Sequence, residues 1–236
     1  MIEIAVQSRS YMGMVDLTMT VSPNMEAFPG SPLPQFVKWA HIDQDGYNME
    51  LVFMSSHTGT HMDAPIHFNK NGASIDTVPL SRLICNASLI RVKLKTNGTI
   101  TKSDITAFES KYDKLVPGQA VVFATRWSDQ IKRRGYFERN PGISYNAAAY
   151  LILRKIGIVG IDSPSIDAGN AHSYPAHNSL CKAGIPIVEN LINLGRIPKQ
   201  NFTLVVMPMK LRGATGSPTR AMALWDNDAP HKHTQS

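Results

Sequence analysis

The chain of 236 residues is 43% hydrophobic and 18% charged, which provides for a substantial core and excludes a disordered protein. Its net charge of +6 is scattered along the sequence, with Lys132-Arg133-Arg134 as the densest group, so no nucleic-acid partner is expected. No apolar run reaches the roughly 18 residues of a membrane-spanning helix, so no membrane partner is expected either.

Two cysteines, Cys85 and Cys181, are too few for a disulfide framework. The chain begins with Met1-Ile2-Glu3 and lacks the basic residues and long apolar stretch of a signal peptide. We therefore expect a cytoplasmic protein.

Stretches rich in β-branched residues and bounded by Pro, Gly or Asn predict strands. In chain order these stretches are 15–21, 49–55, 87–94, 120–125, 156–161 and 202–207. Helical patterns alternate with them and are predicted at 101–111, 144–156, 175–183 and 188–194. Strands mixed with helices indicate an α/β or α+β fold, and no repeat or low-complexity linker divides the chain.

We expect one domain over residues 1–236. Its first part, 1–48, could form an N-terminal arm that packs on a neighbouring molecule. The last residues, 228–236, contain His231 and His233 and are expected to form a mobile tail.

The segment from His57 to His67 reads H-T-G-T-H-M-D-A-P-I-H and is the densest group of chemically active residues in the chain. It holds His57, His61, Asp63 and His67, and imidazoles with carboxylates are the usual ligands of zinc and manganese ions. A single buried histidine is more often a hydrogen-bonded core residue. Four titratable groups this close are costly to bury without a partner, so they indicate a metal or catalytic site.

The spacing of this segment favours an extended backbone. Alternate side chains of a strand point to one face, so all four of these residues, His57, His61, Asp63 and His67, could face one way. A helix would turn Asp63 away from the two histidines, and Gly59 and Pro65 also disfavour a helix. We predict a strand end that runs into a loop.

Further candidates lie more than ninety residues downstream. Asp162 and Asp167 follow a predicted buried strand, at the strand end where α/β folds place functional residues. His172 and His177 come next, and Glu189 follows an apolar run twelve residues after His177. Glu189 could be a partly exposed acid at a helix start, or a buried carboxylate that needs a partner or a metal.

Several segments together resemble the cyclase family, a group that includes bacterial kynurenine formamidase and isatin hydrolase. The most specific is H-T-G-T-H-M-D-A-P-I-H-F, which is similar to the family signature. Weaker likenesses occur in the family order at Asp16-Leu17-Thr18, Phe28-Pro29-Gly30, 160–167, 187–194 and 213–221. The resemblance implies a single-domain swivelling β/β/α fold and a homodimer or homotetramer.

The resemblance also implies roles for individual residues. The positions that match the formamidase metal ligands are His57, His61, Asp63, His177 and Glu189. In that enzyme the Asp and the Glu are thought to touch both ions of a binuclear site, so two Zn²⁺ per chain, or Mn²⁺, are the expected cofactors.

Two further positions match residues that act on the substrate. His67 matches the proton-transferring histidine. Phe28 falls where the formamidase has a substrate-contacting tryptophan, in a W-P-G-D stretch that reads F-P-G-S here. This departure keeps an aromatic surface but loses the indole N–H and the acid.

The expected function is a metal-dependent hydrolase that cleaves the C–N bond of a small amide. An ion with an open coordination position lowers the pKa of bound water to roughly 7, and a histidine with a pKa near 6.5 suits proton transfer. The specific expectation is an arylformamidase that converts N-formyl-kynurenine to kynurenine and formate in tryptophan catabolism. The alternatives are isatin hydrolase-like opening of a cyclic amide or lactone, and a non-catalytic metal-binding protein.

Three other residues are weaker candidates for the functional site. Ser217 and Arg220 could bind an anionic substrate group, or could belong to a structural turn. Cys181 lies near His177 in sequence, but nothing specific supports a nucleophile there, and a core position is expected.

Overall fold

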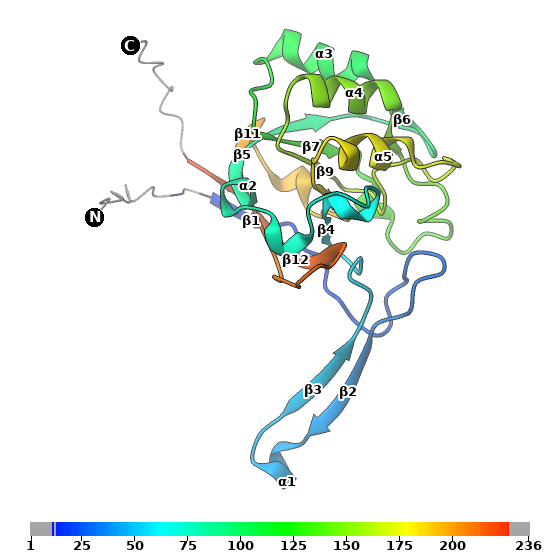
Figure 1. Ribbon diagram of the computed structural model, residues 1–236, viewed down its shortest axis with the longest axis vertical. Coiled ribbons are helices and arrows are strands. Elements are labelled where there is room, and N and C mark those ends of the chain that lie inside the picture. Colours follow the sequence, from blue (N-terminus) through cyan, green and yellow to red (C-terminus); the bar gives the residue numbers. More distant parts are fainter. Residues whose placement is uncertain (1–10, 12, 227–236) are drawn as a thin grey trace, which may run out of the picture.

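One strongly curved sheet of eight strands organises the computed structural model, which describes residue 11 and residues 13–226 (Figure 1). The strands lie in the order β1 (Gly13–Asp16), β12 (Gly216–Trp225), β11 (Asn201–Pro208), β5 (Ile84–Arg91), β7 (Ala120–Ala124), β9 (Ile158–Ile161), β10 (Ile187–Glu189) and β4 (His61–Asp63). The start of β12 also pairs with β4, so the sheet closes on itself like a barrel. This closure confirms a mixed α/β fold.

Helices cover the outside of the parallel part of this sheet, which consists of β5, β7, β9 and β10. They are α3 (Lys102–Lys111), α4 (Tyr145–Leu153) and α5 (Pro175–Lys182). The short helices are α1 (Ile42–Asp45) and α2 (Leu80–Leu83), with 3₁₀ turns η1 (Pro65–His67), η2 (Ile75–Thr77), η3 (Trp127–Gln130) and η4 (Leu194–Arg196). No helix among the described residues is long and apolar enough to cross a membrane.

The two faces of the sheet bury two separate hydrophobic cores. In β7, Val121 and Phe123 belong to the core shared with the helices, whereas Ala120 and Val122 face the interior of the barrel. Side chains alternate between the faces of a strand, and both faces are covered here, so β7 is apolar at every position.

Two small two-stranded sheets stand apart from the main one. β6 (Thr99–Ile100) pairs with β8 (Gly142–Ile143) beside the helices. β2 (Gln35–Ala40) and β3 (Met49–Phe53) form a hairpin that projects away from the rest of the molecule (Figure 1). Within the predicted N-terminal arm, β1 is part of the main sheet and only the hairpin projects. The predicted tail 228–236 lies outside the described residues.

Most predicted elements are confirmed, one helix is wrong, and the strand predicted at 15–21 overlaps β1 only at Val15 and Asp16. The strands at 49–55, 120–125 and 202–207 and the helices at 101–111, 144–156 and 175–183 match β3, β7, β11, α3, α4 and α5. The helix predicted at 188–194 is instead the strand β10 followed by a loop and η4. A short apolar run such as this one is compatible with a buried strand as well as with a helix. The segment forms a strand because it pairs with β4 on one side and with β9 on the other.

Helix α3 begins with a capping box at Thr101. The hydroxyl of Thr101 accepts a hydrogen bond from the backbone N–H of Asp104, and the Asp104 carboxylate accepts one from the backbone N–H of Thr101. Thr101→Ala should lower the free energy of unfolding by about 1 kcal/mol, measured as the midpoint shift in urea at constant slope. Thr106→Ala, inside the same helix, is the control; an equal loss from both variants would contradict the capping role.

Candidate active site

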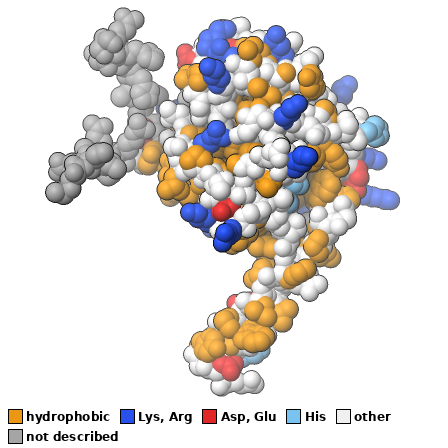
Figure 2. Space-filling view, viewed as in Figure 1, with side chains coloured by type: hydrophobic (Ala, Val, Ile, Leu, Met, Phe, Trp, Pro, Cys, Tyr) orange, Lys and Arg blue, Asp and Glu red, His pale blue; other side chains and the backbone are white. Residues whose placement is uncertain are grey.

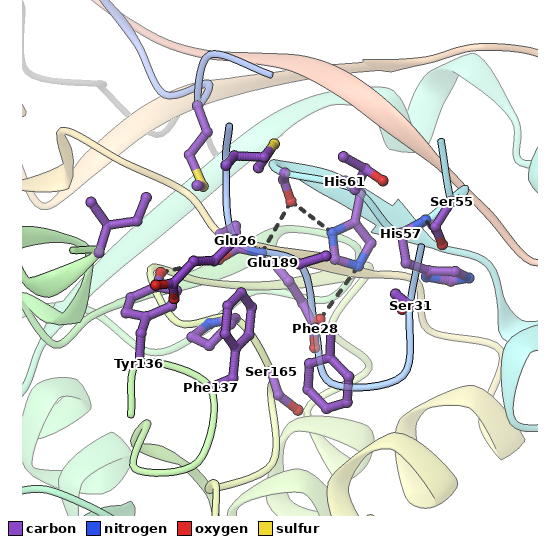
Figure 3. Close-up of a pocket in the computed structure, with 18 of the residues that line it drawn as sticks. Glu26, Phe28, Ser31, Ser55, His57, His61, Tyr136, Phe137, Ser165 and Glu189 are labelled. Carbon is purple, nitrogen blue, oxygen red and sulfur yellow. Dashed lines mark hydrogen bonds and ion pairs between the residues drawn. The ribbon is translucent and has the colours of Figure 1, made fainter. Parts of the chain in front are cut away.

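A pocket of about 720 Å³ opens at the carboxyl ends of β9 and β10 (Figure 3). Histidines, carboxylates and aromatic rings line it, and two of these rings, Phe68 and Tyr174, lie against His177. The polar group comprises His57, His61, His67, His177 and Glu189, and the aromatic group comprises Phe28, Phe68, Tyr136, Phe137 and Tyr174. This combination is typical of a small-molecule site, which is mostly apolar with a few convergent polar groups.

The register between β4 and β10 places three of the predicted site residues on one face. His61 lies opposite Glu189, and Asp63 lies opposite Ile187, whose side chain packs in the core on the helix side. Residues two apart on a strand share a face, so His61, Asp63 and Glu189 all point towards the side covered by α5. The predicted alternation is therefore correct for His61 and Asp63. It is wrong for His67, because the strand ends at Asp63 and His67 lies in the 3₁₀ turn η1.

The other two predicted ligands come from outside these strands. His57 lies in the turn before β4, and its Nδ1 is 2.6 Å from Oδ1 of Asp63. Gly216 of β12 makes room for it, because a Cβ at that position would lie 2.7 Å from Cε1 of His57. His177, the third residue of α5, points its Nε2 at Oε1 of Glu189, 3.1 Å away.

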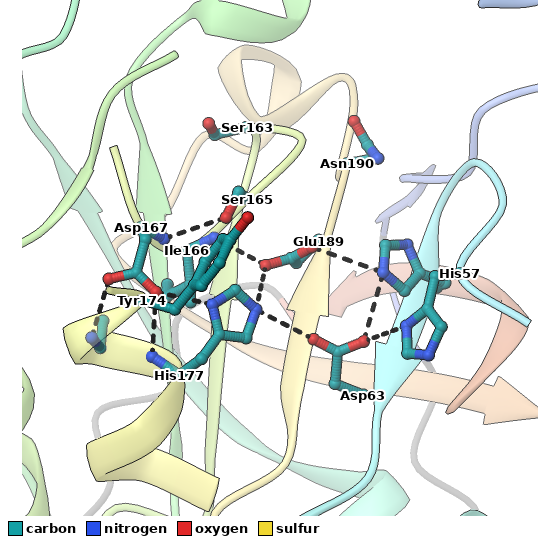
Figure 4. A network of polar contacts seen from close by, with 12 residues as sticks. His57, Asp63, Ser163, Ser165, Ile166, Asp167, Tyr174, His177, Glu189 and Asn190 are labelled. Atoms are coloured by element: carbon teal, nitrogen blue, oxygen red, sulfur yellow. Dashed lines mark hydrogen bonds and ion pairs between the residues drawn. The ribbon is translucent and has the colours of Figure 1, made fainter. Parts of the chain in front are cut away.

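Asp63 stands at the centre of this cluster (Figure 4). Its Oδ1 faces His57 and lies 3.3 Å from Nε2 of His61, whereas its Oδ2 lies 3.3 Å from Nε2 of His177. Oε2 of Glu189 completes the ring at 3.4 Å from Nε2 of His61. The cluster thus consists of two groups that share Asp63: His57, His61 and Asp63, and Asp63, His177 and Glu189.

The donor set fits a divalent metal ion. Within each group the ligand atoms lie within 4.8 Å of one another, and imidazole nitrogens with carboxylate oxygens suit zinc or manganese. Oδ2 of Asp63 is fully buried and has no hydrogen-bond partner among the described residues. A buried carboxylate oxygen without a partner is costly, and a cation between it and His177 would satisfy it.

Hydrogen bonds behind the cluster fix which nitrogen of each histidine faces it. Nδ1 of His61 donates to the carbonyl oxygen of Gly59 at 2.9 Å, which leaves Nε2 for the cluster. Nε2 of His57 lies 2.9 Å from the hydroxyl of Thr215, which leaves Nδ1 for the cluster. Such outer contacts orient metal-ligating histidines and set their tautomer.

His177 has the strongest such partner. Its Nδ1 lies 2.6 Å from Oδ2 of Asp167, a fully buried carboxylate. The same carboxylate accepts hydrogen bonds from the backbone N–H groups of Ala176 and His177 in the first turn of α5. Asp167 therefore fixes the start of the helix and the orientation of the imidazole together.

Without a metal the cluster holds its charge as ion pairs. Burial alone would lower the pKa of His61, yet hydrogen bonds to Asp63 and Glu189 raise it to about 10. Burial likewise opposes ionisation of Asp63, but the surrounding histidines hold the pKa of that carboxyl well below its usual range. The raised pKa of His61 and the lowered pKa of Asp63 both show that the cluster favours positive charge between the two carboxylates.

His67 differs from the five histidine and carboxylate groups of the cluster. Burial of the side chain lowers the pKa of His67 to about 4, so its ring is neutral at pH 7. The ring stacks on that of His57 with centroids 4.1 Å apart, and no hydrogen bond among the described residues occupies either of its nitrogens. A neutral imidazole that lines the pocket can accept a proton there.

Phe28 lines the pocket together with Phe137 (Figure 3). Its ring meets that of Phe137 edge to face, with centroids 5.9 Å apart. The wall thus places two rings where a flat substrate could pack.

Three downstream candidates do not join the cluster. Asp162 accepts hydrogen bonds from the backbone N–H groups of Thr125 and Arg126, and burial raises its pKa to about 6. His172 is exposed and is not part of the pocket wall. Cys181 is fully buried in the core between the helices and the sheet.

Ser217 and Arg220 both belong to β12 and not to a turn. The Ser217 hydroxyl accepts a hydrogen bond from the backbone N–H of Met209. Arg220 forms an exposed ion pair with Asp16 of the neighbouring strand, with 2.7 Å between Nη2 and Oδ2. Neither residue lines the pocket.

Sequence reasoning missed Thr215 and the role of Asp167. Asp167 stood out as an acid after a strand, but its pairing with His177 depends on how α5 packs. Thr215 meets His57 across 158 residues of sequence, because β12 closes the sheet against β4. No local pattern signals such a contact.

The chain is similar to several known proteins. The model of the Cyclase family, described as "Putative cyclase", matches residues 15–168. A kynurenine formamidase from Bacillus cereus is 29% identical over 210 residues, which cover 88% of this chain and 95% of that protein. A crystal structure of an isatin hydrolase with a bound product analogue, thioisatinate, is similar with a TM-score of 0.82 at 28% identity, covering 90% of this chain and 92% of that one. A structure titled as a potential metal-dependent hydrolase with cyclase activity is similar with a TM-score of 0.74 at 28% identity. The match covers 92% of this chain and 99% of that one.

Asp167→Asn should weaken metal binding by about 10- to 100-fold, the usual cost of losing such an outer contact. An asparagine keeps the shape of the side chain, but its amide N–H₂ can face Nδ1 of His177 and favour the tautomer that protonates Nε2. Competition with a chromophoric chelator measures the affinity without any assay of activity. Asp162→Asn, a buried carboxylate that contacts no histidine, is the matched control; equal affinities for Asp167→Asn and wild type would contradict the positioning role.

Proposed function

The chain belongs to the cyclase family, and from this premise we propose that it is a metal-dependent hydrolase that cleaves the C–N bond of a small amide. The specific reaction that we propose is that of an arylformamidase, from N-formyl-kynurenine to kynurenine and formate. One observation carries the proposal: two groups of metal-ligating residues share Asp63 beside an aromatic pocket. The likeness to a kynurenine formamidase over most of both chains supports the substrate.

We propose that His57, His61, Asp63, His177 and Glu189 hold the metal, and that two Zn²⁺ ions, or Mn²⁺, are bound per chain. Two overlapping ligand groups support a pair of ions. When bound, such ions supply a Lewis acid and lower the pKa of water to roughly 7.

His67 is proposed to move the proton. Hydrolysis adds water across the amide: the oxygen joins the carbonyl carbon, the C–N bond breaks, and the nitrogen leaves with a proton. A neutral imidazole beside the pocket can take a proton from the attacking water and return it to the departing nitrogen. Stacking on His57 holds the His67 ring in place for both transfers.

Phe28 is proposed to hold the aryl ring of the substrate. With Phe137 it forms the aromatic side of a pocket large enough for a substrate of this size. The apolar wall also keeps bulk water from the reacting carbonyl. Since Phe28 has no N–H to donate, we expect it to select by shape and stacking alone.

A second candidate is isatin hydrolase-like opening of a cyclic amide or lactone. The similarity to the isatin hydrolase structure supports it, and a flat bicyclic lactam would fit the same aromatic wall. A non-catalytic metal-binding protein would have no need of the neutral His67 beside its ligands.

We also propose a homodimer or homotetramer in the cytoplasm. Two unpaired cysteines, Cys85 and Cys181, suit a reducing compartment. The projecting hairpin of β2 and β3 supports self-association, because both of its strands are largely exposed and rich in hydrophobic side chains (Figure 2).

His67→Ala should retain its metal and lose about 10²–10⁴-fold in kcat, because only the proton transfer is removed. Elemental analysis and hydrolysis of N-formyl-kynurenine measure the two effects. Asp63→Ala is the contrasting variant and should lose metal. Near wild-type kcat in His67→Ala, or full metal content in Asp63→Ala, would refute the respective role.

The number of metal ions per chain and the preferred substrate together distinguish the two candidate reactions. For an arylformamidase we expect two ions per chain and faster turnover of N-formyl-kynurenine than of isatin. A single ion with preferential opening of isatin or a lactone would replace the first proposal by the second. Inactivity on formanilides, isatin and lactones with each metal restored would favour a binding protein. A variant without 228–236 controls for metal held by His231 and His233.

A further inference from the structure

Two opposite charges line the pocket without belonging to the metal cluster. They are Glu26 and Lys132, the charged side chains that the described residues contribute to the pocket wall beyond the cluster and His67. Neither side chain forms an ion pair or a hydrogen bond with another described residue. Both are exposed to solvent, which places them at the mouth of the pocket. Two charges without partners at the mouth are available to a ligand.

The sequence around Glu26 sets this residue apart. It is the only charged residue between Leu17 and Val37, in the connection that leads from β1 to the hairpin. Figure 3 shows its side chain on the side of the pocket where Tyr136 lies, away from His57. A single carboxylate at the pocket, in a connection otherwise without charge, points to a positively charged group on the ligand.

The opposite charge comes from the densest basic group of the chain. Of Lys132, Arg133 and Arg134, only Lys132 lines the pocket. Its segment continues to Phe137, whose ring meets that of Phe28 edge to face. The segment that carries Glu26 and the segment that carries Lys132 are therefore in contact, and each adds one aromatic ring and one charge to the pocket.

The head group of an α-amino acid carries the two charges that these side chains complement. Its ammonium group suits the carboxylate of Glu26, and its carboxylate suits the ammonium group of Lys132. Both groups of such a ligand are strongly hydrated, so burying them deep in the pocket would be costly. At an exposed mouth they keep part of their water, while an aryl ring can enter between the aromatic side chains.

We propose that Glu26 and Lys132 form a subsite for the zwitterionic head of an aryl-substituted α-amino acid, and that they select amides with such a head over neutral amides. The inference rests on the proposed hydrolysis of N-formyl-kynurenine, in which a short chain joins the aryl formamide to an α-amino acid head. Isatin and simple lactones have no head group to place at the mouth. The subsite therefore favours the linear amide over the cyclic one.

Equilibrium binding of kynurenine, the product that keeps the head group, tests the subsite without hydrolysis. Titration calorimetry on the metal-loaded protein compares kynurenine with kynurenamine, which lacks the carboxylate, and with deaminated kynurenine, which lacks the ammonium group. Lys132→Met should weaken kynurenine and the deaminated ligand by about two- to five-fold, the range of an exposed ion pair, and leave kynurenamine unchanged. Glu26→Gln should weaken kynurenine and kynurenamine by a similar factor and leave the deaminated ligand unchanged.

The matched controls are Arg134→Met and Glu138→Gln. Both residues are exposed, lie within six residues of Lys132 in sequence and do not line the pocket, so both variants should bind all three ligands like wild type. Added salt should reduce the selective losses of the two test variants, because it screens exposed charges.

The outcomes separate the subsite from the reaction. Selective losses would support the subsite even if N-formyl-kynurenine is not hydrolysed, in which case the proposed reaction alone fails. The subsite would be overturned by a wild type that does not bind kynurenine, by test variants that bind all three ligands unchanged, or by an equal loss of all three. Each of these results holds whatever the hydrolysis assay shows.

Discussion

The site depends on one constraint, the complete burial of the Asp63 carboxylate. Removing a carboxylate from water costs several kcal/mol unless charges and hydrogen bonds replace the lost hydration. Three histidines face its two oxygens, and each is held from behind by another polar group. The buried carboxylates raise the pKa values of His61 and His177, and a metal ion would supply in place of those protons the positive charge that the two imidazoles carry. Stability and metal binding are therefore two consequences of the same arrangement.

Closure of the sheet is what brings these groups together. β4 is three residues long, yet it pairs on one side with β10 and on the other with β12. The first pairing sets Glu189 beside His61, and the second brings Thr215 and Gly216 against His57. A shift of one residue in either pairing would turn Asp63 into the barrel interior, because alternate residues face opposite sides. The register is fixed by the apolar residues between the ligands, such as Met62.

Local pattern alone could predict part of this site. The two-residue spacing of His61 and Asp63 places them on one face in a strand and apart in a helix, and the strand is observed. His57 fits the same alternation but reaches Asp63 from a turn. For His177 and Glu189 the assignment came from resemblance, since their proximity depends on the packing of α5 over β10. The error at 188–194 has the same origin: the short strand β10 is defined by its neighbours, which lie far away in sequence.

The parts of the site differ in how firmly the fold holds them. The groups around Asp63 lie on paired strands and a packed helix, which leave little freedom for their positions. Phe28 lies on a connection without regular secondary structure, between β1 and the projecting hairpin. A substitution such as F-P-G-S for W-P-G-D can therefore alter the substrate wall without disturbing a strand or a ligand. The closed sheet therefore positions the groups of the proposed chemistry, whereas the proposed choice of substrate depends on the segment that leads into the projecting hairpin.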